Sequence, residues 1–274
     1  MGYRALGADV VKITSPSNPK IKRLVKLKNR KTREQSGLSL VDGFREVSRA
    51  REAGLLFEEF YICPELLNAF GGQKLVDEIN SWRLEPTGVS AGVFEKISFG
   101  ERKEGVIAVI RTPRFPLDAA ALPPDPLIVV LENIEKPGNL GAILRTCDAA
   151  GVDAVIIADT KTDILNPNVI RASTGIVFSS IIMQATGLQV RDFLKQNGCQ
   201  ILAATPAGKQ SHFLTDLRGG IAFVLGSEDQ GLSQMWLDSA DVLVAIPMKG
   251  KADSLNVSAT AAVLVYESLR QRRY

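Results

Sequence analysis

Short apolar runs separated by helical segments fill the second half of the chain. The first run, residues 127–131, is continuously apolar, as strands buried on both faces of a parallel sheet are. Strand-like runs recur at residues 154–157, 181–183, 200–204, 221–225 and 242–246, and segments with helical spacing fill the gaps. This order predicts an α/β domain with a mostly parallel sheet covered by helices on both faces. Ligands of such sheets bind beyond the carboxyl ends of the strands, so we expect the chemistry in the loops that follow them.

A proline-rich segment divides the chain. Residues 112–126 hold five prolines, which suits a stiff linker better than a regular element. Before it, residues 37–111 alternate short strand-like and helical runs and predict a small α/β domain. After it, residues 127–274 form the domain described above, and residues 1–36 form a basic extension at the front.

The net charge of +3 conceals a strong asymmetry along the chain. Residues 1–36 hold ten basic side chains and two acidic ones. Ile21, Leu24, Val25 and Leu27 interleave these charges at helical spacing, which predicts a basic amphipathic helix. A polyanion is the natural partner, because each Lys or Arg that neutralises a phosphate releases counterions. The residues expected to contact such a polyanion, a nucleic acid, are Lys20, Lys22, Arg23, Lys26, Lys28 and Arg30.

Several classes of protein are excluded by composition. The longest uncharged stretch, residues 172–190, holds too many Ser, Thr, Gly and Gln residues for a membrane span, and residues 1–11 lack an apolar signal core, so we expect a cytoplasmic protein. The three cysteines are too far apart for a zinc motif and predict buried, reduced thiols. His212 is the single histidine, so we expect no metal site.

Three loops that follow strands carry unusual groups of polar and small residues. The first holds Asn139, Gly141 and Arg145, spaced as N-x-G-x-x-x-R; the second reads Gly-Ser-Glu-Asp-Gln-Gly over residues 226–231. The third runs from Ile246-Pro-Met to Ser-Leu-Asn-Val-Ser at residues 254–258. Each alone could be an ordinary turn or helix cap.

Together and in this order, the three loops resemble the motifs of SpoU-type (TrmH-like) RNA 2′-O-ribose methyltransferases of the SPOUT superfamily. The resemblance implies a deep trefoil knot near the carboxyl end, a small substrate-binding domain in front, S-adenosylmethionine as cofactor, and a homodimer. Ribosomal RNA of the 23S type is the first expectation for the substrate and transfer RNA the second. The face of the last helix formed by Val257, Ala261, Leu264 and Val265 would either hold the dimer together or pack inside its own chain.

The resemblance also assigns site residues. Those expected to line the cofactor pocket are Leu225, Gly226, Ile246, Met248 and Leu255. Arg145 would act either as the base that accepts the 2′-hydroxyl proton or as a fixed cation that holds a phosphate and stabilises the forming alkoxide. A guanidinium normally stays protonated, which makes the first role demanding. The residues expected to orient Arg145 and the ribose are Asn139, Glu228, Ser254 and Asn256.

Two other functions remain open from the sequence. The loop of residues 136–141 opens a helix after a strand and is followed by Asp159, which resembles the site of a Rossmann-type NAD-dependent oxidoreductase. However, Lys136 occupies the first glycine position of that fingerprint. A non-catalytic RNA- or ribosome-binding protein would explain the basic extension but not Arg145, Glu228 and Asn256 together.

Overall fold

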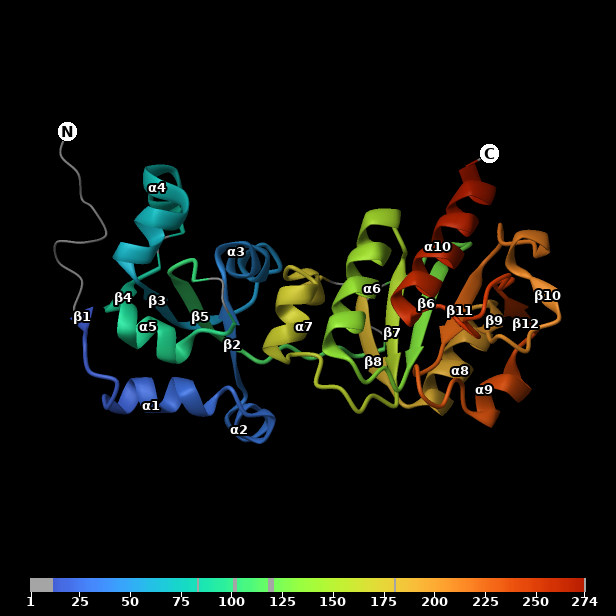
Figure 1. The fold of residues 1–274 in the computed structure, drawn as a ribbon, viewed down its shortest axis with the longest axis horizontal. Helices are drawn as coiled ribbons and strands as arrows, with labels where there is room; N and C mark the ends of the chain where they lie inside the picture. Colours follow the sequence, from blue (N-terminus) through green and yellow to red (C-terminus); the bar gives the residue numbers. More distant parts are fainter. Residues whose placement is uncertain (1–11, 83, 101–102, 118–120, 180, 274) are drawn as a thin grey trace. The chain divides into compact units, whose positions relative to one another are not determined.

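The computed structural model describes residues 12–82, 84–100, 103–117, 121–179 and 181–273, and its chain divides into two compact units (Figure 1). One unit runs to Pro113 and also takes in Leu165–Phe178. The other comprises Arg114–Ile164 and the chain from Ser179 onward. Residues 1–11, where the sequence shows no signal core, lie outside the described part of the chain.

The amino-terminal unit is built on a five-stranded mixed sheet with the order β1-β4-β3-β5-β2. Strand β5 runs antiparallel to both β2 and β3, whereas β4 runs parallel to β3 and β1. Strand β4 has little signal in the sequence, because it is four residues long and contains a proline and a glycine, both poor strand formers. The strands are β1 (Lys12–Ile13), β2 (Leu38–Asp42), β3 (Phe57–Ile62), β4 (Pro86–Val89) and β5 (Val106–Arg111).

The basic amino-terminal segment forms two short helices rather than one. Helix α1 (Pro19–Lys26) starts where Asn18 accepts a hydrogen bond from the Lys20 amide at 2.9 Å, and α2 (Arg30–Ser36) starts in the same way at Asn29. The apolar face of α1 packs on α5 (Ala91–Ile97) and buries Ile21 and Leu24 completely. The other two helices of the sheet are α3 (Phe44–Glu52) and α4 (Pro64–Ser81). The amphipathic helix expected from the sequence therefore docks on the core of its own unit.

The segment Leu165–Phe178 packs with the amino-terminal unit although it lies between two strands of the other unit. It contains α7 (Pro167–Ala172) and the 3₁₀ turn η1 (Ile176–Phe178). The guanidinium of Arg49 on α3 donates to both the carbonyl and the hydroxyl of Thr174 at 2.6 Å. Arg171 donates to the Phe99 carbonyl. Charged hydrogen bonds of this kind are strong when partly buried, so they fix the segment to its unit.

The second unit contains a seven-stranded sheet with the order β10-β12-β9-β11-β6-β7-β8, in which every neighbouring pair is parallel. This confirms the predicted parallel α/β fold. Its strands are β6 (Leu127–Glu132), β7 (Ala154–Ala158), β8 (Ile182–Ala185), β9 (Gln200–Ala204), β10 (Gln210–Ser211), β11 (Ile221–Leu225) and β12 (Val242–Ala245). The knot implied by the resemblance remains a prediction.

Helices cover both faces of this sheet. Helices α8 (Gly187–Gln196) and α9 (Gln234–Ser239) pack on the face that carries Ile128 and Val130. Because side chains alternate along a strand, Val129 and Leu131 point to the other face, where α6 (Pro137–Ala150) and α10 (Val257–Arg273) lie side by side (Figure 1). The short turn η2 (His212–Leu214) follows β10.

The face of α10 proposed for a dimer contact is buried within its own chain. Val257, Ala261, Leu264 and Val265 are all at most 6% exposed, and α10 packs on α6. The sequence left open whether this face holds a dimer together or packs within its own chain, and in the structure it packs within the chain. The face is therefore not available to a second copy.

Neither a membrane span nor a metal cluster occurs in the described part of the chain. None of its helices is long and apolar enough to cross a membrane. No three His, Cys, Asp or Glu side chains there are grouped so that they could hold a metal ion. Cys63, Cys147 and Cys199 are buried free thiols, as the sequence predicts.

Candidate active site

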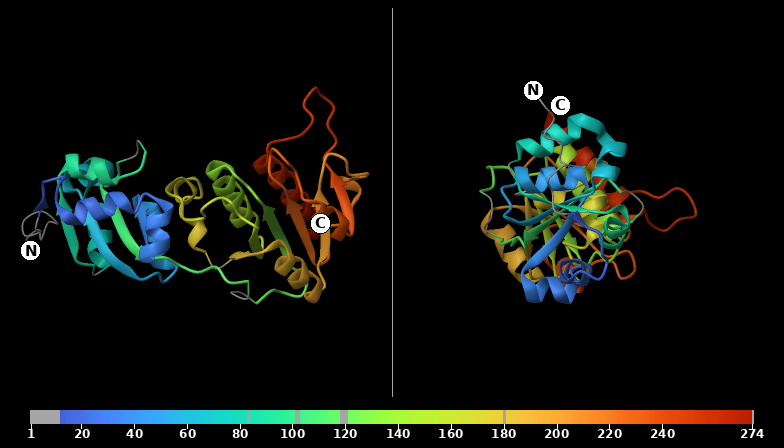
Figure 2. Two further views of the ribbon diagram at one scale, coloured as in Figure 1. Left: turned by 90° about the horizontal axis from the view of Figure 1, so that it is seen from below. Right: turned by 90° about the vertical axis from the view of Figure 1, so that its left-hand side faces the viewer.

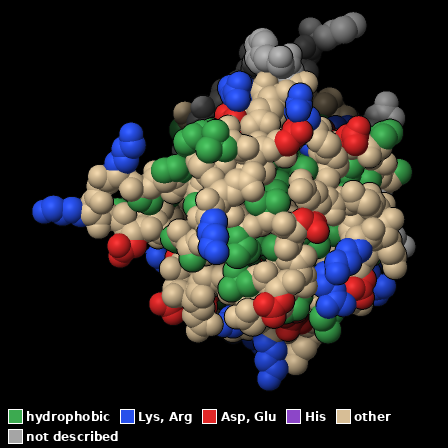
Figure 3. Space-filling view, turned by 90° about the vertical axis from the view of Figure 1, so that its right-hand side faces the viewer, with side chains coloured by type: hydrophobic (Ala, Val, Ile, Leu, Met, Phe, Trp, Pro, Cys, Tyr) green, Lys and Arg blue, Asp and Glu red, His purple; other side chains and the backbone are tan. Residues whose placement is uncertain are grey.

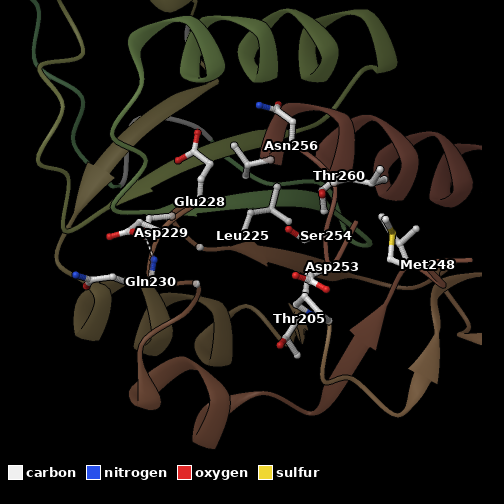
Figure 4. Close-up of a pocket in the computed structure, with 18 of the residues that line it drawn as sticks. Thr205, Leu225, Glu228, Asp229, Gln230, Met248, Asp253, Ser254, Asn256 and Thr260 are labelled. Atoms are coloured by element: carbon white, nitrogen blue, oxygen red, sulfur yellow. Dashed lines mark hydrogen bonds between the residues drawn. The ribbon is translucent and has the colours of Figure 1, made fainter. Parts of the chain in front are cut away.

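A pocket of about 530 Å³ lies at the carboxyl ends of β9, β11 and β12 (Figure 4). Its wall is formed by the loops that follow these three strands, by the first turns of α10, and by Lys136 from the loop after β6. The strands end at the same edge because they are parallel, so loops far apart in the sequence meet there. The pocket thus stands where the strand order predicts a ligand site.

The five residues expected to hold the cofactor all line this pocket: Leu225, Gly226, Ile246, Met248 and Leu255. Leu225 is the last residue of β11 and is buried, whereas Leu255 leaves 37% of its surface exposed. An apolar side chain exposed on a pocket wall offers its surface to a ligand rather than to the core.

Gly226 is required by the protein backbone itself. A Cβ atom at this position would lie 2.3 Å from the carbonyl carbon of Gly231 and 2.5 Å from the amide nitrogen of Leu232. The loop closes through a hydrogen bond of 3.0 Å from the Gly231 amide to the Ser227 carbonyl, and Gly231 adopts a left-handed φ of +67°. The resemblance places Gly226 in the cofactor pocket, and the structure shows that a side chain there would first meet the loop's own backbone.

A chain of side-chain hydrogen bonds joins the three motif loops. The Asn139 amide nitrogen donates to a carboxylate oxygen of Glu228, and the Asn256 amide nitrogen donates to the Asn139 oxygen at 3.3 Å. The Asn256 oxygen accepts from the amide and the hydroxyl of Ser258, at 2.9 and 2.6 Å, at the start of α10. Glu228, Ser254 and Asn256 line the pocket, and Asn139 is one hydrogen bond away from it. The structure therefore brings together four of the five residues expected to act in catalysis.

Arg145 stands apart from this group. It lies on α6, its side chain is exposed, and it is not among the residues that line the pocket. The structure records no hydrogen bond or ion pair for it with any described residue. This chain alone therefore does not supply the desolvated setting that the role of base demands.

Sequence reasoning missed part of the pocket wall. Thr205 and Pro206 follow β9, Asp253 lies within the third loop just before Ser254, and all three line the pocket. Figure 4 shows Thr205 and Asp253 on the wall. Thr205 and Pro206 could have been found from the sequence, because ligands bind at the carboxyl ends of parallel strands and β9 is such a strand, next to β11. The ionisable residues of the wall are three acids and one base: Glu228, Asp229, Asp253 and Lys136. This excess of carboxylates favours a ligand that carries positive charge.

Among the expected RNA-contacting residues, half are already engaged within the amino-terminal unit. Arg23 pairs with Glu59, Arg30 pairs with Glu34, and Lys28 donates to the Ser98 carbonyl at 2.7 Å, where burial lowers its pKa. The remaining three, Lys20, Lys22 and Lys26, are exposed on α1. The charge count therefore overstates the number of cations free to meet a phosphate.

Comparison with known proteins identifies both parts of the chain. The SpoU rRNA Methylase family matches residues 126–266, and the MRM3-like substrate binding domain matches residues 18–108. An uncharacterized tRNA/rRNA methyltransferase from Synechocystis is 31% identical over 272 residues, which cover 97% of this chain and 96% of the relative.

Solved structures agree with this assignment. A crystal structure of an RNA 2′-O ribose methyltransferase is 40% identical, covers 96% of this chain and all of its own, and gives a TM-score of 0.84. The SpoU methyltransferase AviRb from Streptomyces viridochromogenes, in complex with AdoMet, is 28% identical with a TM-score of 0.84 and covers 93% of this chain and 98% of its own. An AdoMet-bound rRNA methyltransferase from Sinorhizobium meliloti is 26% identical with a TM-score of 0.83 and covers 96% and 98%.

These similarities do not favour the oxidoreductase reading. They support S-adenosylmethionine as the cofactor of the family, since two of the similar structures hold it. The three motif loops, the parallel sheet and the domain in front all agree with the matched families. The chain belongs to the SpoU family of RNA methyltransferases and carries an MRM3-like substrate-binding domain before its methyltransferase domain.

Proposed function

We propose that this protein transfers a methyl group from S-adenosylmethionine to a ribose 2′-hydroxyl of RNA. The observation that carries the proposal is the pocket at the ends of β9, β11 and β12, with the Asn256–Asn139–Glu228 chain of hydrogen bonds at its edge. The 40% identical structure described as an RNA 2′-O ribose methyltransferase supports the choice of the 2′-hydroxyl.

The pocket fits the cofactor in size and in charge. A volume of about 530 Å³ is typical of small-molecule sites, which range over roughly 300–1,000 Å³. When bound, S-adenosylmethionine supplies an electrophilic methyl group on a positively charged sulfur. Leu225, Ile246 and Leu255 would hold its apolar parts, and Asp253 places a carboxylate on the wall for its positive charge.

The polar residues at the pocket would align the ribose. Glu228 is fixed by Asn139, and Ser254 and Asn256 present their side chains to the pocket from the loop before α10. Such fixed groups lower the barrier by holding the hydroxyl in line with the methyl group. Arg145 would act once substrate or a second copy covers it, as a fixed cation beside a phosphate or as the proton acceptor.

The amino-terminal unit would supply most of the RNA affinity. Lys20, Lys22 and Lys26 are exposed on α1, and they lie within residues 18–108, which match the substrate-binding domain. Each phosphate that they neutralise would release counterions and add affinity. We propose ribosomal RNA as the substrate ahead of transfer RNA, since the Sinorhizobium meliloti structure is described as an rRNA methyltransferase. The protein would then act in the cytoplasm, where that RNA is found. A homodimer, implied by the resemblance, would use surfaces other than the buried face of α10.

Ribose-methylation mapping of total RNA tests the proposal. RNA from cells with and without the gene should differ at one or a few 2′-O-methylated nucleotides. The purified protein should restore those marks in the deficient RNA with S-adenosylmethionine. S-adenosylmethionine, and not NAD, should raise the melting temperature, because a ligand that binds only the native state stabilises it. Identical methylation maps and no transfer in vitro would refute the proposed activity.

A further inference from the structure

The loop between β12 and α10 leaves the pocket wall and then returns to it. Ile246 and Met248 line the pocket, residues 249–252 are exposed, and the wall resumes at Asp253. In both views of Figure 2 this loop, in the red part of the colour scale, projects away from the body of its unit. Its tip therefore stands beside the pocket but belongs to neither the wall nor the core.

The tip carries two cations that the fold does not use. Lys249 and Lys251 are both exposed, and within the described part of the chain neither has a recorded hydrogen bond or ion pair. Gly250 between them has open space around its Cα, where a Cβ would meet no atom within 4 Å. Figure 3 shows a lobe projecting from this unit with Lys or Arg side chains at its end. Packing and pairing within the chain thus leave these two ammonium groups without a structural role.

The electrostatics of the pocket give such cations a use. A ribose can present its 2′-hydroxyl to the pocket only if the RNA strand crosses the pocket mouth. The two phosphates that flank the target ribose are bonded to it through its 3′ and 5′ oxygens, so they stay near the rim. Glu228, Asp229 and Asp253 on the wall would repel these phosphates. Cations beside the mouth would offset that repulsion.

We propose that Lys249 and Lys251 hold the phosphates that flank the target ribose. This inference rests on the proposed RNA methylation and deepens it, because it assigns a second RNA contact, distinct from helix α1. The surface of α1 would bind RNA at large, whereas the loop tip aligns the one strand that enters the pocket. The partner is a ribose–phosphate strand, recognised by charge and without reading its bases.

The test compares the double variant Lys249→Gln/Lys251→Gln with wild type and with Lys195→Gln. Lys195 is a matched control, since it is exposed on α8 of the same unit and does not line the pocket. The methyl acceptor is total RNA from cells that lack the gene, and the donor is radiolabelled S-adenosylmethionine. The double variant should raise the KM for RNA roughly tenfold, and the slope of log KM against log salt should fall by about 0.7 per lysine lost. Its affinity for S-adenosylmethionine should stay within about twofold of wild type, and Lys249→Arg/Lys251→Arg should restore most of the salt slope.

Acylation of lysines provides a second readout. Bound RNA should protect Lys249 and Lys251 from an amine-reactive reagent and leave Lys195 reactive. An unchanged salt slope in the double variant, or an equal loss in Lys195→Gln, would overturn the phosphate-holding role. Weakened binding of S-adenosylmethionine with an unchanged KM for RNA would also overturn it. If wild-type protein transfers no methyl group to this RNA, the proposed function fails, and that result is distinct from failure of the loop.

Discussion

Asn256 donates a hydrogen bond to Asn139 at 3.3 Å across 117 positions of the chain, and Asn139 in turn donates to Glu228. The pair fixes the start of α10 to the first turns of α6 beside the pocket. Three loops that are separate in the sequence thereby share one hydrogen-bonded edge.

Replacing Asn139 should slow methyl transfer without weakening the binding of the cofactor. Asn139→Ala leaves Glu228 without its donor. Loss of a donor that contacts the reacting atoms costs about 10²–10³ in kcat, so loss of Asn139, which acts through Glu228, should cost at most that much. Asn139 does not line the pocket, so the Kd for S-adenosylmethionine should change less than about twofold. Single-turnover rates and calorimetry measure the two quantities. Gln196→Ala, an exposed amide on α8, is the control and should leave both unchanged. A selective loss of cofactor binding in Asn139→Ala would contradict the orienting role.

Arg145→Ala should nearly abolish methyl transfer, because it removes the side chain that both proposed roles require. The affinity for S-adenosylmethionine should stay close to that of wild type, because Arg145 does not line the pocket. Arg145→Lys separates its two roles. If Arg145 accepts the proton, the lysine variant should shift the pH profile of the single-turnover rate. If it is a fixed cation, the rate should drop by a roughly constant factor of about 10²–10³ at every pH. A rate near wild type in Arg145→Ala would refute both roles.

Gly226→Ala should destabilise the pocket loop. The added Cβ would fall 2.3 Å from the Gly231 backbone, so the loop must shift, and overpacking of this kind costs about 1–3 kcal/mol. We expect a lower melting temperature and weaker S-adenosylmethionine binding. Gly92→Ala is the matched control, since it lies in helix α5 with open space around it and should stabilise by up to about 1 kcal/mol. Equal melting temperatures for Gly226→Ala and wild type would show that the loop tolerates the side chain.

The three lysines of α1 should govern the salt dependence of RNA binding. Deleting residues 1–36 is a poor test, because it removes Ile21 and Leu24 from the core of the unit. Lys20→Gln/Lys22→Gln/Lys26→Gln should instead weaken RNA binding and reduce the log–log salt slope by about 0.7–0.9 per residue. Arg23→Gln should have a smaller effect, since Arg23 already pairs with Glu59. An unaltered slope in the triple variant, measured by fluorescence anisotropy, would end this assignment.

Asp42 should make the stability of the amino-terminal unit depend on pH. Its side chain is 3% exposed, and burial raises its pKa to about 7, although its carboxylate accepts from the Phe99 amide at 2.5 Å. Glu46 and Glu104 add to this rise, whereas Arg171 opposes it.

Because the folded pKa lies above the unfolded value of about 3.9, the folded state binds the extra proton between these values. The free energy of unfolding should therefore fall as pH rises from about 4 to about 7, by at most about 4 kcal/mol from this group. Asp42→Asn keeps the acceptor for Phe99 and should be more stable than wild type at pH 8 but not at pH 4. Urea unfolding of both proteins checks this, and equal pH dependence would contradict it.

Much of the fold can be predicted from short stretches of the sequence. Continuous apolar runs such as residues 127–131 can be buried on both sides only between two helical layers, so they indicate the parallel sheet by themselves. The caps of α1 and α2 are also local, because Asn18 and Asn29 bond to amides two residues away. The spacing of the motifs, through its resemblance to a family, identified two of the three loops that form the pocket, those after β11 and β12.

Contacts between distant residues decided the rest. Pairing with β3 makes β4 a strand in spite of Pro86 and Gly88, and no local preference would suggest it. The segment Leu165–Phe178 joins the amino-terminal unit through Arg49, which no pattern within the segment encodes. The sequence shows that Arg23 is charged, but only the fold shows that Glu59 neutralises it. Periodicity and capping act within a few residues and can be read along the chain, whereas pairing, burial and charge compensation depend on which distant residues the tertiary structure brings together.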